Sequence, residues 1–276
     1  MDRVVVADSS ANLLSLPGVR FACVPLKIVT AETEYTDDGT LDVDAMVAEL
    51  ASYKGRSGSS CPNIQEWLNA FGEAEEVFAV TITSALSGSW TSAVQAGKEY
   101  LRLHPRARVH VLDSLSAGPE MQLIAEKLRA LTIRSADFDE TVSAIEDYRR
   151  HTRLLFCLGS MKNLARNGRT SLAAAALAGV LGIRIVGAAS DGGTLELLHK
   201  CRGRNAALDT LRRCMADRGY AGGRVRIAHC QNREGADILR FMLLDAWPEA
   251  DVRVLPTRGL CSFYAESGGL MIGFEG

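Results

Sequence analysis

Long hydrophobic runs are missing from this chain of 276 residues. The longest apolar candidate, SLAAAALAGVLGIRIV, is interrupted by Gly179, Gly182 and Arg184. It falls short of the roughly 18 apolar residues that a membrane-spanning helix needs. The amino-terminal MDRVVVADSS also lacks the apolar stretch of a signal peptide. We therefore expect a cytoplasmic protein.

A dominant charge of one sign is also absent. The 31 Lys and Arg residues balance 33 Asp and Glu residues, which gives a formal net charge of -2. This balance provides no general field for binding nucleic acid or an acidic membrane surface, so we expect no nucleic-acid partner. Hydrophobic residues make up 47% of the chain, enough for one large core or two modest ones.

The motifs of metal and nucleotide sites are missing as well. The seven cysteines include no C-x-x-C pair, and the chain contains no H-E-x-x-H. An odd, scattered set predicts free thiols in a reducing compartment and argues against a structural zinc site. Neither G-x-x-x-x-G-K-[ST] nor G-x-G-x-x-G occurs. The sequence therefore predicts no metal and no cofactor.

The first half of the chain alternates strand-like and helix-like segments. The strand-like segments are residues 3–7, 21–29, 77–82 and 108–112. The helix-like segments are residues 42–53, 64–71, 90–101, 121–131 and 137–150. This alternation predicts an α/β fold with a mainly parallel sheet covered by helices.

The rhythm changes around residues 153–159. Beyond them, helices are expected at residues 172–181, 206–218 and 235–246, and strands at 183–188, 224–229, 252–255 and 269–274. Hairpin-like strands mixed with helices are typical of an α+β domain. We therefore expect a first domain over residues 1–155 and a smaller α+β domain, with a mixed or antiparallel sheet, over residues 156–276.

Hydroxyl-rich turns follow three of the predicted strands. They are Asp8-Ser9-Ser10, residues 83–89 and residues 113–118. The carboxyl ends of parallel strands meet at one edge of a sheet, where ligands bind. The Asp8 and Asp113 turns are either ordinary helix N-caps, since one cap needs one polar side chain, or part of a ligand site.

The turn SALSGSW, residues 84–90, holds more hydroxyls than a cap needs. Gly88 lets a ligand approach the backbone closely, and a helix N-terminus suits a carboxylate or phosphate. The loop GRSGSSCPN, residues 55–63, places Ser59 and Ser60 before Pro62. This loop is either an ordinary capped loop or a second hydroxyl donor that faces the first.

A nucleophilic role for Ser87 is an alternative. The hydrolase elbow is G-x-S-x-G, whereas this serine lies in A-L-S-G-S. None of the five histidines, at positions 104, 110, 151, 199 and 229, stands in a recognisable triad context. A serine-dependent acyl transferase or hydrolase, and a sensor of a small anionic metabolite, remain alternative functions.

Several segments, in their order and spacing, resemble the DegV family of bacterial fatty-acid-binding proteins over nearly the whole chain. LSGSWTSA is similar to the family signature LSGTYQSA, and SSCPN to TSQPS. VVVADSSANL and VHVLDSLSAG resemble its two strand-ending DS motifs. LARNGRTS and HKCRGR resemble its LKKGGRIS and its basic KVRGR segment.

The resemblance implies a Rossmann-like amino-terminal domain and a smaller carboxy-terminal one. It implies that a long-chain fatty acid lies in an apolar tunnel with its carboxylate held by Ser59 or Ser60 and by Ser87 with the Gly88 backbone. It further implies a non-catalytic carrier that presents the acid to a fatty acid kinase. Transient contact with a membrane is compatible with that role.

The chain departs from the family pattern at several positions. Cys61 stands where the family has glutamine, and Ala265 where its H-x-G-P-G motif has histidine. The change at Ala265 bears on the phosphoryl-transfer step more than on lipid binding, and Glu266 is a candidate to fill the gap. Arg169 and Arg202 are candidates for contact with the head group or a partner, or are solvated surface charges.

Overall fold

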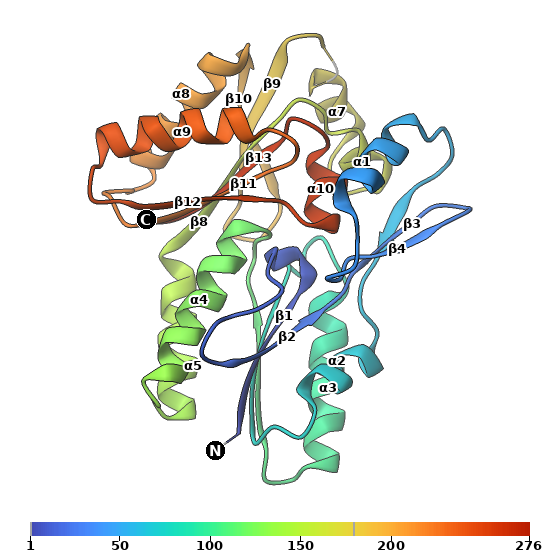
Figure 1. The fold of residues 1–276 in the computed structure, drawn as a ribbon, viewed down its shortest axis with the longest axis vertical. Coiled ribbons are helices and arrows are strands. Elements are labelled where there is room, and N and C mark those ends of the chain that lie inside the picture. The colour runs from blue at the N-terminus through green and yellow to red at the C-terminus, as the bar shows by residue number, and fades with distance from the viewer. Residues whose placement is uncertain (1, 179) are drawn as a thin grey trace.

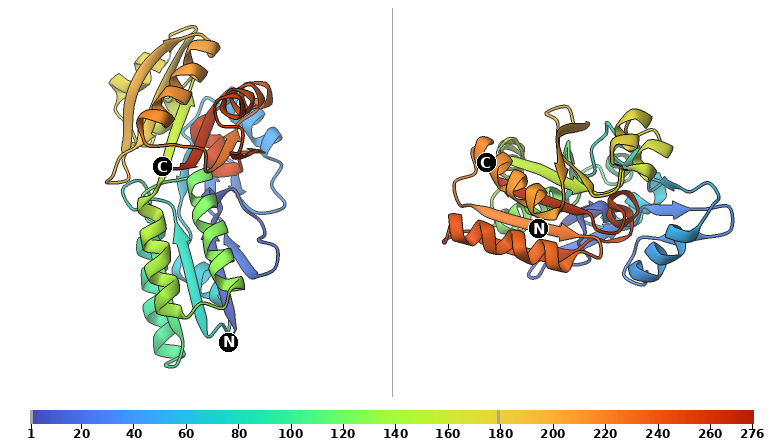
Figure 2. Two further views of the ribbon diagram at one scale, coloured as in Figure 1. Left: turned by 90° about the vertical axis from the view of Figure 1, so that its left-hand side faces the viewer. Right: turned by 90° about the horizontal axis from the view of Figure 1, so that it is seen from above.

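The structure, a computed structural model, describes residues 2–178 and 180–276. Two main sheets lie one above the other in Figure 1 and in the left view of Figure 2. A small third sheet lies beside them. The first main sheet belongs to the amino-terminal half and the second to the carboxy-terminal half, so the change of rhythm in the sequence corresponds to a change of sheet.

The amino-terminal sheet is parallel, with strand order β2-β1-β6-β7. Its strands are β1 (Arg3–Asp8), β2 (Arg20–Val24), β6 (Glu76–Thr81) and β7 (Arg108–Asp113). Its helices are α2 (Ile64–Phe71), α3 (Ser89–Leu103), α4 (Pro119–Ile133) and α5 (Phe138–Arg150). Val4 and Val6 pack against α2 and α3, and Val5 packs against α4 and α5. Burial on both faces explains why β1 and β6 read as continuous apolar runs.

The expected strand over residues 21–29 is two strands in different sheets. β2 ends at Val24, and β3 (Lys27–Val29) begins after Pro25, which has no N–H to donate to a ladder. β3 pairs antiparallel with β4 (Glu34–Thr36) and β5 (Gly58–Ser60) to form the small sheet. Helix α1 (Val43–Ser52) lies between β4 and β5 in the chain.

The carboxy-terminal sheet is mixed, with strand order β10-β9-β8-β13-β11-β12. Within it, β11 and β12 pair in parallel, and the other neighbours pair antiparallel. The strands are β8 (Thr152–Leu158), β9 (Ile183–Ala189), β10 (Leu195–Arg202), β11 (Arg224–His229), β12 (Asp251–Pro256) and β13 (Leu270–Glu275). The helices are α6 (Lys162–Arg166), α7 (Leu172–Ala178), α8 (Arg204–Asp217), α9 (Arg233–Ala246) and α10 (Gly259–Ala265).

Alternation along β8 separates the two faces of this sheet. Leu155 and Cys157 pack with residues of α8 and α9, while Phe156 and Leu158 pack with residues of α6 and α10. Successive side chains of a strand point to opposite faces, so residues 154, 156 and 158 share the face away from α8 and α9. This face borders the site described below. The expected helix over residues 172–181 corresponds to α7, which ends at Ala178, and Gly179 lies outside the described residues.

Helix α4 connects the two main sheets, because it packs on β1 and β6 and also on β11 and β13. Glu126 of α4 forms an ion pair of 2.7 Å with the buried Arg226 of β11. The expected boundary between residues 155 and 156 falls inside β8. Since all of β8 belongs to the second sheet, we propose that the division lies near its start, at Thr152.

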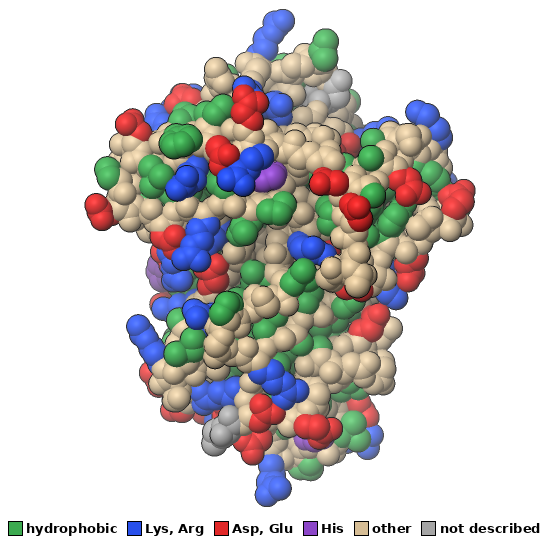
Figure 3. Space-filling view, in the orientation of Figure 1, with side chains coloured by type: hydrophobic (Ala, Val, Ile, Leu, Met, Phe, Trp, Pro, Cys, Tyr) green, Lys and Arg blue, Asp and Glu red, His purple; other side chains and the backbone are tan. Residues whose placement is uncertain are grey.

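Charged side chains of both signs are interspersed over most of the face in Figure 3. Acidic side chains gather at the right, over α1 and the β3–β4 hairpin. No broad basic surface is visible on this face, in keeping with the net charge of -2. Among the described residues, no helix is long and apolar enough to cross a bilayer.

Candidate functional site

The turns that follow β1, β6 and β7 meet at one edge of the parallel sheet, where the carboxylates of Asp8 and Asp113 join them. Asp8, at the end of β1, accepts hydrogen bonds from the Ile82 backbone N–H at 2.9 Å and from Ser89 Oγ at 2.6 Å. It also accepts bonds from the backbone and side chain of Ser10. Burial raises the pKa of Asp8, while these donors oppose the shift. The Asp8 turn therefore holds the sheet edge together.

Asp113 has a similar role after β7. Its carboxylate accepts hydrogen bonds from the backbone N–H groups of Ser84 and Leu115, each at 3.1 Å. Asp113 thus connects its own turn to the turn after β6. For both DS motifs, the polar side chains satisfy backbone donors of neighbouring turns.

The serines of the turn after β6 divide into two groups. Ser89 is buried and bonds to Asp8, whereas Ser87 is half-buried and lines a cavity. Ser87 Oγ accepts a bond from the Ser89 N–H at 3.2 Å, so it keeps its own proton for another acceptor. Gly88 is the N-cap of this 15-residue helix, α3, and provides no side-chain cap. Because Ser87 Oγ takes the N–H of Ser89, the first residue of α3, the N–H groups of the next two residues are the ones left without a side-chain cap.

The backbone angle φ of Gly88 is -75°, which any residue can adopt, so its conformation does not call for glycine. The close approach of the Cys61 side chain does. A Cβ at this position would lie 3.1 Å from Cys61 Sγ. The expected loop around Ser59 is in part a strand, β5, in which Ser59 lies opposite Ile28 of β3. The antiparallel pairing of β5 with β3 places Ser59 and Ser60 at the same cavity as Ser87.

The cavity has a volume of about 320 Å³ and lies between the two main sheets and the small sheet. Four of its lining residues are the predicted Ser59, Ser60, Ser87 and Gly88, which the structure brings together. The other lining residues, mostly apolar, are Leu26, Cys61, Ile82, Leu86, Ala117, Leu154, Phe156, Leu158, Leu164, Arg169, Leu195, Leu260, Cys261, Tyr264, Ala265 and Met271.

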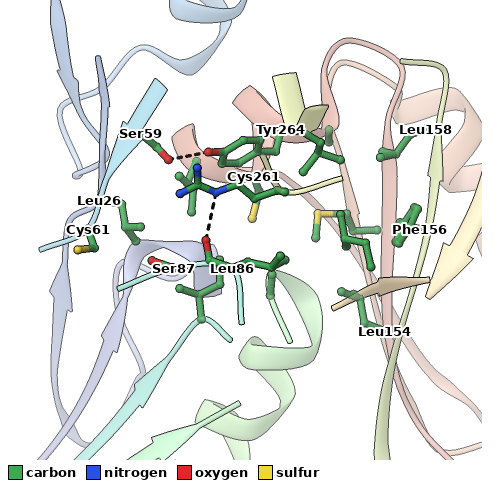
Figure 4. A pocket seen from close by; sticks show the side chains of 18 of the residues that line it. Leu26, Ser59, Cys61, Leu86, Ser87, Leu154, Phe156, Leu158, Cys261 and Tyr264 are labelled. Atoms are coloured by element: carbon green, nitrogen blue, oxygen red, sulfur yellow. Dashed lines mark hydrogen bonds between the residues drawn. The ribbon is translucent and has the colours of Figure 1, made fainter. Parts of the chain in front are cut away.

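The serines gather on one side of the cavity, where Leu26 and Leu86 also lie, and the opposite side is apolar (Figure 4). In Figure 4, Ser59, Cys61 and Ser87 lie on one side of the cavity, and Leu154, Phe156 and Leu158 lie on the other. These three β8 residues are each at most 4% exposed. An amphiphile with one polar end fits this division, with its head at the serines and its apolar part toward β8.

Arg169 is the cationic residue among those that line the cavity. Its Nε donates to the Leu86 carbonyl at 3.2 Å, and its Nη1 donates to the Asn167 carbonyl. Among the described residues, no acidic side chain forms an ion pair with it. A half-buried guanidinium without a carboxylate partner favours an anion nearby.

Arg202 and Glu266 do not line this cavity. Arg202 is exposed on β10. Glu266 accepts a hydrogen bond from the Asn163 N–H at 3.1 Å, and borders a separate cavity beside α1. Ala265 itself lines the main cavity and is 3% exposed, whereas Glu266 is not among the residues that line it.

Tyr264 is the polar lining residue that the sequence analysis missed. Its hydroxyl lies 2.7 Å from Ser59 Oγ, as the dashed line in Figure 4 marks. It lies 205 positions from Ser59 in the chain, so no local pattern relates the two residues.

The cavity lacks the groups that would activate a serine or cysteine nucleophile. None of the five histidines, all within the described residues, lines the cavity. Burial raises the pKa of the Cys261 thiol, which keeps it protonated and apolar. All seven cysteines are free thiols, as the sequence predicts. Five of them are buried, whereas Cys61 is exposed and Cys23 is half-buried. In the described part of the chain, no three His, Cys, Asp or Glu side chains lie together as metal ligands would.

Comparison with known proteins agrees with this geometry. The model of an uncharacterised protein family, DegV, matches residues 3–275. A DegV domain-containing protein of Streptococcus pneumoniae strain R6 is 42% identical over 275 residues, which are 98% of each chain. The chain belongs to the DegV family.

Solved structures resemble this DegV protein over its whole length. A DegV family protein from Eubacterium eligens, loaded with heptadecanoic acid, is 44% identical with a TM-score of 0.97, and the match covers 99% of each chain. The Fatty Acid Kinase (Fak) B3 protein of Streptococcus pneumoniae, loaded with linoleic acid, is 42% identical with a TM-score of 0.98. That match covers 100% of this chain and 99% of the other.

Proposed function

We propose that this DegV protein binds a long-chain fatty acid, with the carboxylate at Ser59, Ser60, Ser87 and the Gly88 backbone and the tail in the cavity. The observation that carries the proposal is the single cavity that joins two serine segments to an apolar wall. The fatty acids held by two structures more than 40% identical to this chain support it.

The tail and the head contribute differently to binding. Burial of the tail contributes about 0.8 kcal/mol per methylene, or roughly 12 kcal/mol gross for about 16 carbons. Ordering and association costs offset much of that gain. Each charge-assisted hydrogen bond to the carboxylate contributes roughly 1.5–3 kcal/mol. The tail therefore determines most of the affinity, and the hydroxyls determine which end lies at the serines.

Arg169 extends the proposed head-group site. Its side chain lines the same cavity and is anchored to the Leu86 carbonyl in the turn that carries Ser87. A guanidinium held there adds positive charge next to the hydroxyl donors. We assign Arg169 to stabilisation of the ionised carboxylate.

The role that we propose is that of a carrier, with no catalytic residue of its own. The likeness to the Fatty Acid Kinase B3 protein supports presentation of the acid to a fatty acid kinase in the cytoplasm. Arg202, exposed on β10, is available to such a partner. Transient membrane contact is supported by the apolar side chains of Leu172, Val180 and Leu181, which are 77%, 57% and 99% exposed near α7.

Mass spectrometry of the ligand extracted from protein purified from bacteria tests the proposal. We expect a long-chain fatty acid in near-stoichiometric amount, and a weaker hold on it in Ser87→Ala. Ser84→Ala is the matched control, since Ser84 is an exposed hydroxyl of the same turn that does not line the cavity.

Three results would contradict the proposal. Protein that is reproducibly empty and has no acyl affinity would remove the carrier role. A short anionic metabolite in the extract would favour the sensor alternative. Covalent labelling of Ser87 by a serine-reactive probe would favour the hydrolase alternative.

A further inference from the structure

The contact between Ser59 and Tyr264 joins two parts of the fold at the polar end of the cavity. Ser59 lies on β5 of the small sheet, and Tyr264 lies on α10, which packs with residues of β8 and α6. Their oxygens are 2.7 Å apart, and both residues line the cavity (Figure 4). Both side chains are half-buried, so the bond is partly shielded from water.

The direction of this hydrogen bond decides what Ser59 offers to a ligand. A phenol O–H is a stronger donor than an aliphatic O–H, so the favoured arrangement has Tyr264 donating to Ser59 Oγ. The serine proton is then free to point into the cavity. In the reverse arrangement, Ser59 would present only lone pairs, which repel a carboxylate.

Packing against neighbouring apolar side chains fixes the position of the Tyr264 ring. It packs against Phe263, with ring centroids 4.8 Å apart, and against the apolar residues around α10. A fixed ring holds the phenol oxygen at one position relative to β5. The hydroxyl of Ser59, which can rotate freely on its own, is thereby restricted to one orientation.

We propose that Tyr264 is a positioning residue that orients the Ser59 proton toward the ligand, so that the site prefers an ionised acid over a neutral head group. The inference rests on the proposed function. A chain of two hydrogen bonds that ends on an anion is strengthened along its length, and bonds to an ionised acceptor are about twice as strong as neutral ones. An ester with the same tail gains neither effect.

Matched ligands separate this role from a structural one. We would titrate the purified protein with hexadecanoic acid and with its methyl ester, which share one tail. Tyr264→Phe keeps the ring and removes the hydroxyl. We expect it to lower the affinity for the acid about tenfold, the loss of roughly 1.4 kcal/mol of head-group bonding, and to leave the ester affinity within about twofold.

A double-mutant cycle tests whether Tyr264 acts through Ser59. In the Ser59→Ala background, Tyr264→Phe should have no further effect on acid binding, because its partner is gone. Ser59→Thr keeps a hydroxyl and should retain the preference for the acid. Thermal unfolding of each variant checks that the fold is intact.

Several outcomes would overturn the inference. Equal losses for acid and ester in Tyr264→Phe would mean that the bond only tethers β5 to α10. Unchanged acid binding, or additive effects in the cycle, would remove the positioning role while the carrier function stands. If the unmodified protein binds neither ligand, the proposed function fails first, and this inference fails with it.

Discussion

Ser89 Oγ donates a hydrogen bond of 2.6 Å to the buried Asp8 carboxylate. Ser89 therefore stabilises the edge of the parallel sheet, although it lies only two positions from Ser87, which lines the cavity. The neighbouring serines of one turn thus carry separate structural and ligand-facing tasks.

This division predicts opposite effects for two similar substitutions. Ser89→Ala leaves Asp8 short of a donor and should lower the free energy of unfolding by about 1–3 kcal/mol, with little change in acid binding to the folded protein. Ser87→Ala should weaken acid binding and change stability little. Urea denaturation and ligand titration of both variants check this. Equal behaviour of the two variants would contradict the division.

The close approach of Gly88 to Cys61 predicts a reversible steric effect. Gly88→Ala places a methyl group about 3.1 Å from Cys61 Sγ and should weaken acid binding by about 1–2 kcal/mol. Cys61→Ala removes the sulfur and should be tolerated alone, because Cys61 is exposed. The double variant should recover most of the lost affinity in the same titration. If Gly88→Ala binds the acid as tightly as the unmodified protein, the close approach does not matter for binding.

The apolar wall on β8 predicts control of acyl length. Leu158→Ala removes three carbon atoms from the wall, so the preferred acid should lengthen by about two methylenes. Leu155→Ala is the matched control, because Leu155 lies on the same strand but packs with α8 and α9. Both variants should lose about 2–5 kcal/mol of stability, and only Leu158→Ala should change the preferred length in competition experiments. A change of length in Leu155→Ala would contradict the assignment of the wall.

Glu120 predicts a dependence of stability on pH. Burial raises its pKa from 4.5 to about 7, although Ser116 and Thr152 each donate a hydrogen bond to it. The folded state therefore holds this proton more tightly than the unfolded chain. Its contribution to stability is full below about pH 4.5 and is lost as the pH rises to about 7, by about 1.4 kcal/mol per pH unit.

The substitution Glu120→Gln checks this prediction. A glutamine stays neutral over the whole window, so the variant should lose this part of the pH dependence. Unfolding of both proteins would be measured between pH 4.5 and 7. Parallel stability curves for the two proteins would show that Glu120 does not titrate there.

Much of the fold could be predicted from the sequence, because local patterns encode it. The apolar run of β6 and the alternation of strands with helices indicated the parallel sheet. Strand β10 escaped prediction because most of its side chains are exposed and its register shifts between Leu197 and His199. Pro25 in the sequence is a signal for the break between β2 and β3, since proline interrupts the hydrogen-bond ladder of a sheet.

The site was partly predictable for a different reason. Serine-rich turns signal hydroxyl donors, and Ser59, Ser60, Ser87 and Gly88 do line one cavity. Tyr264 lies on a short helix far along the chain, and only tertiary packing brings it to Ser59. The same holds for the β8 wall, whose role depends on which face of a mixed sheet meets the serine turns.

The most direct test of the central claim is a crystal structure with a long-chain fatty acid that carries bromine on its terminal carbon. Anomalous scattering then locates the tail end independently of the carboxylate. We predict carboxylate oxygens within about 2.6–3.2 Å of the hydroxyls of Ser59, Ser60 or Ser87, and bromine against Leu154, Phe156 or Leu158. Bromine at the serine turns, or an acid bound outside the cavity, would contradict it.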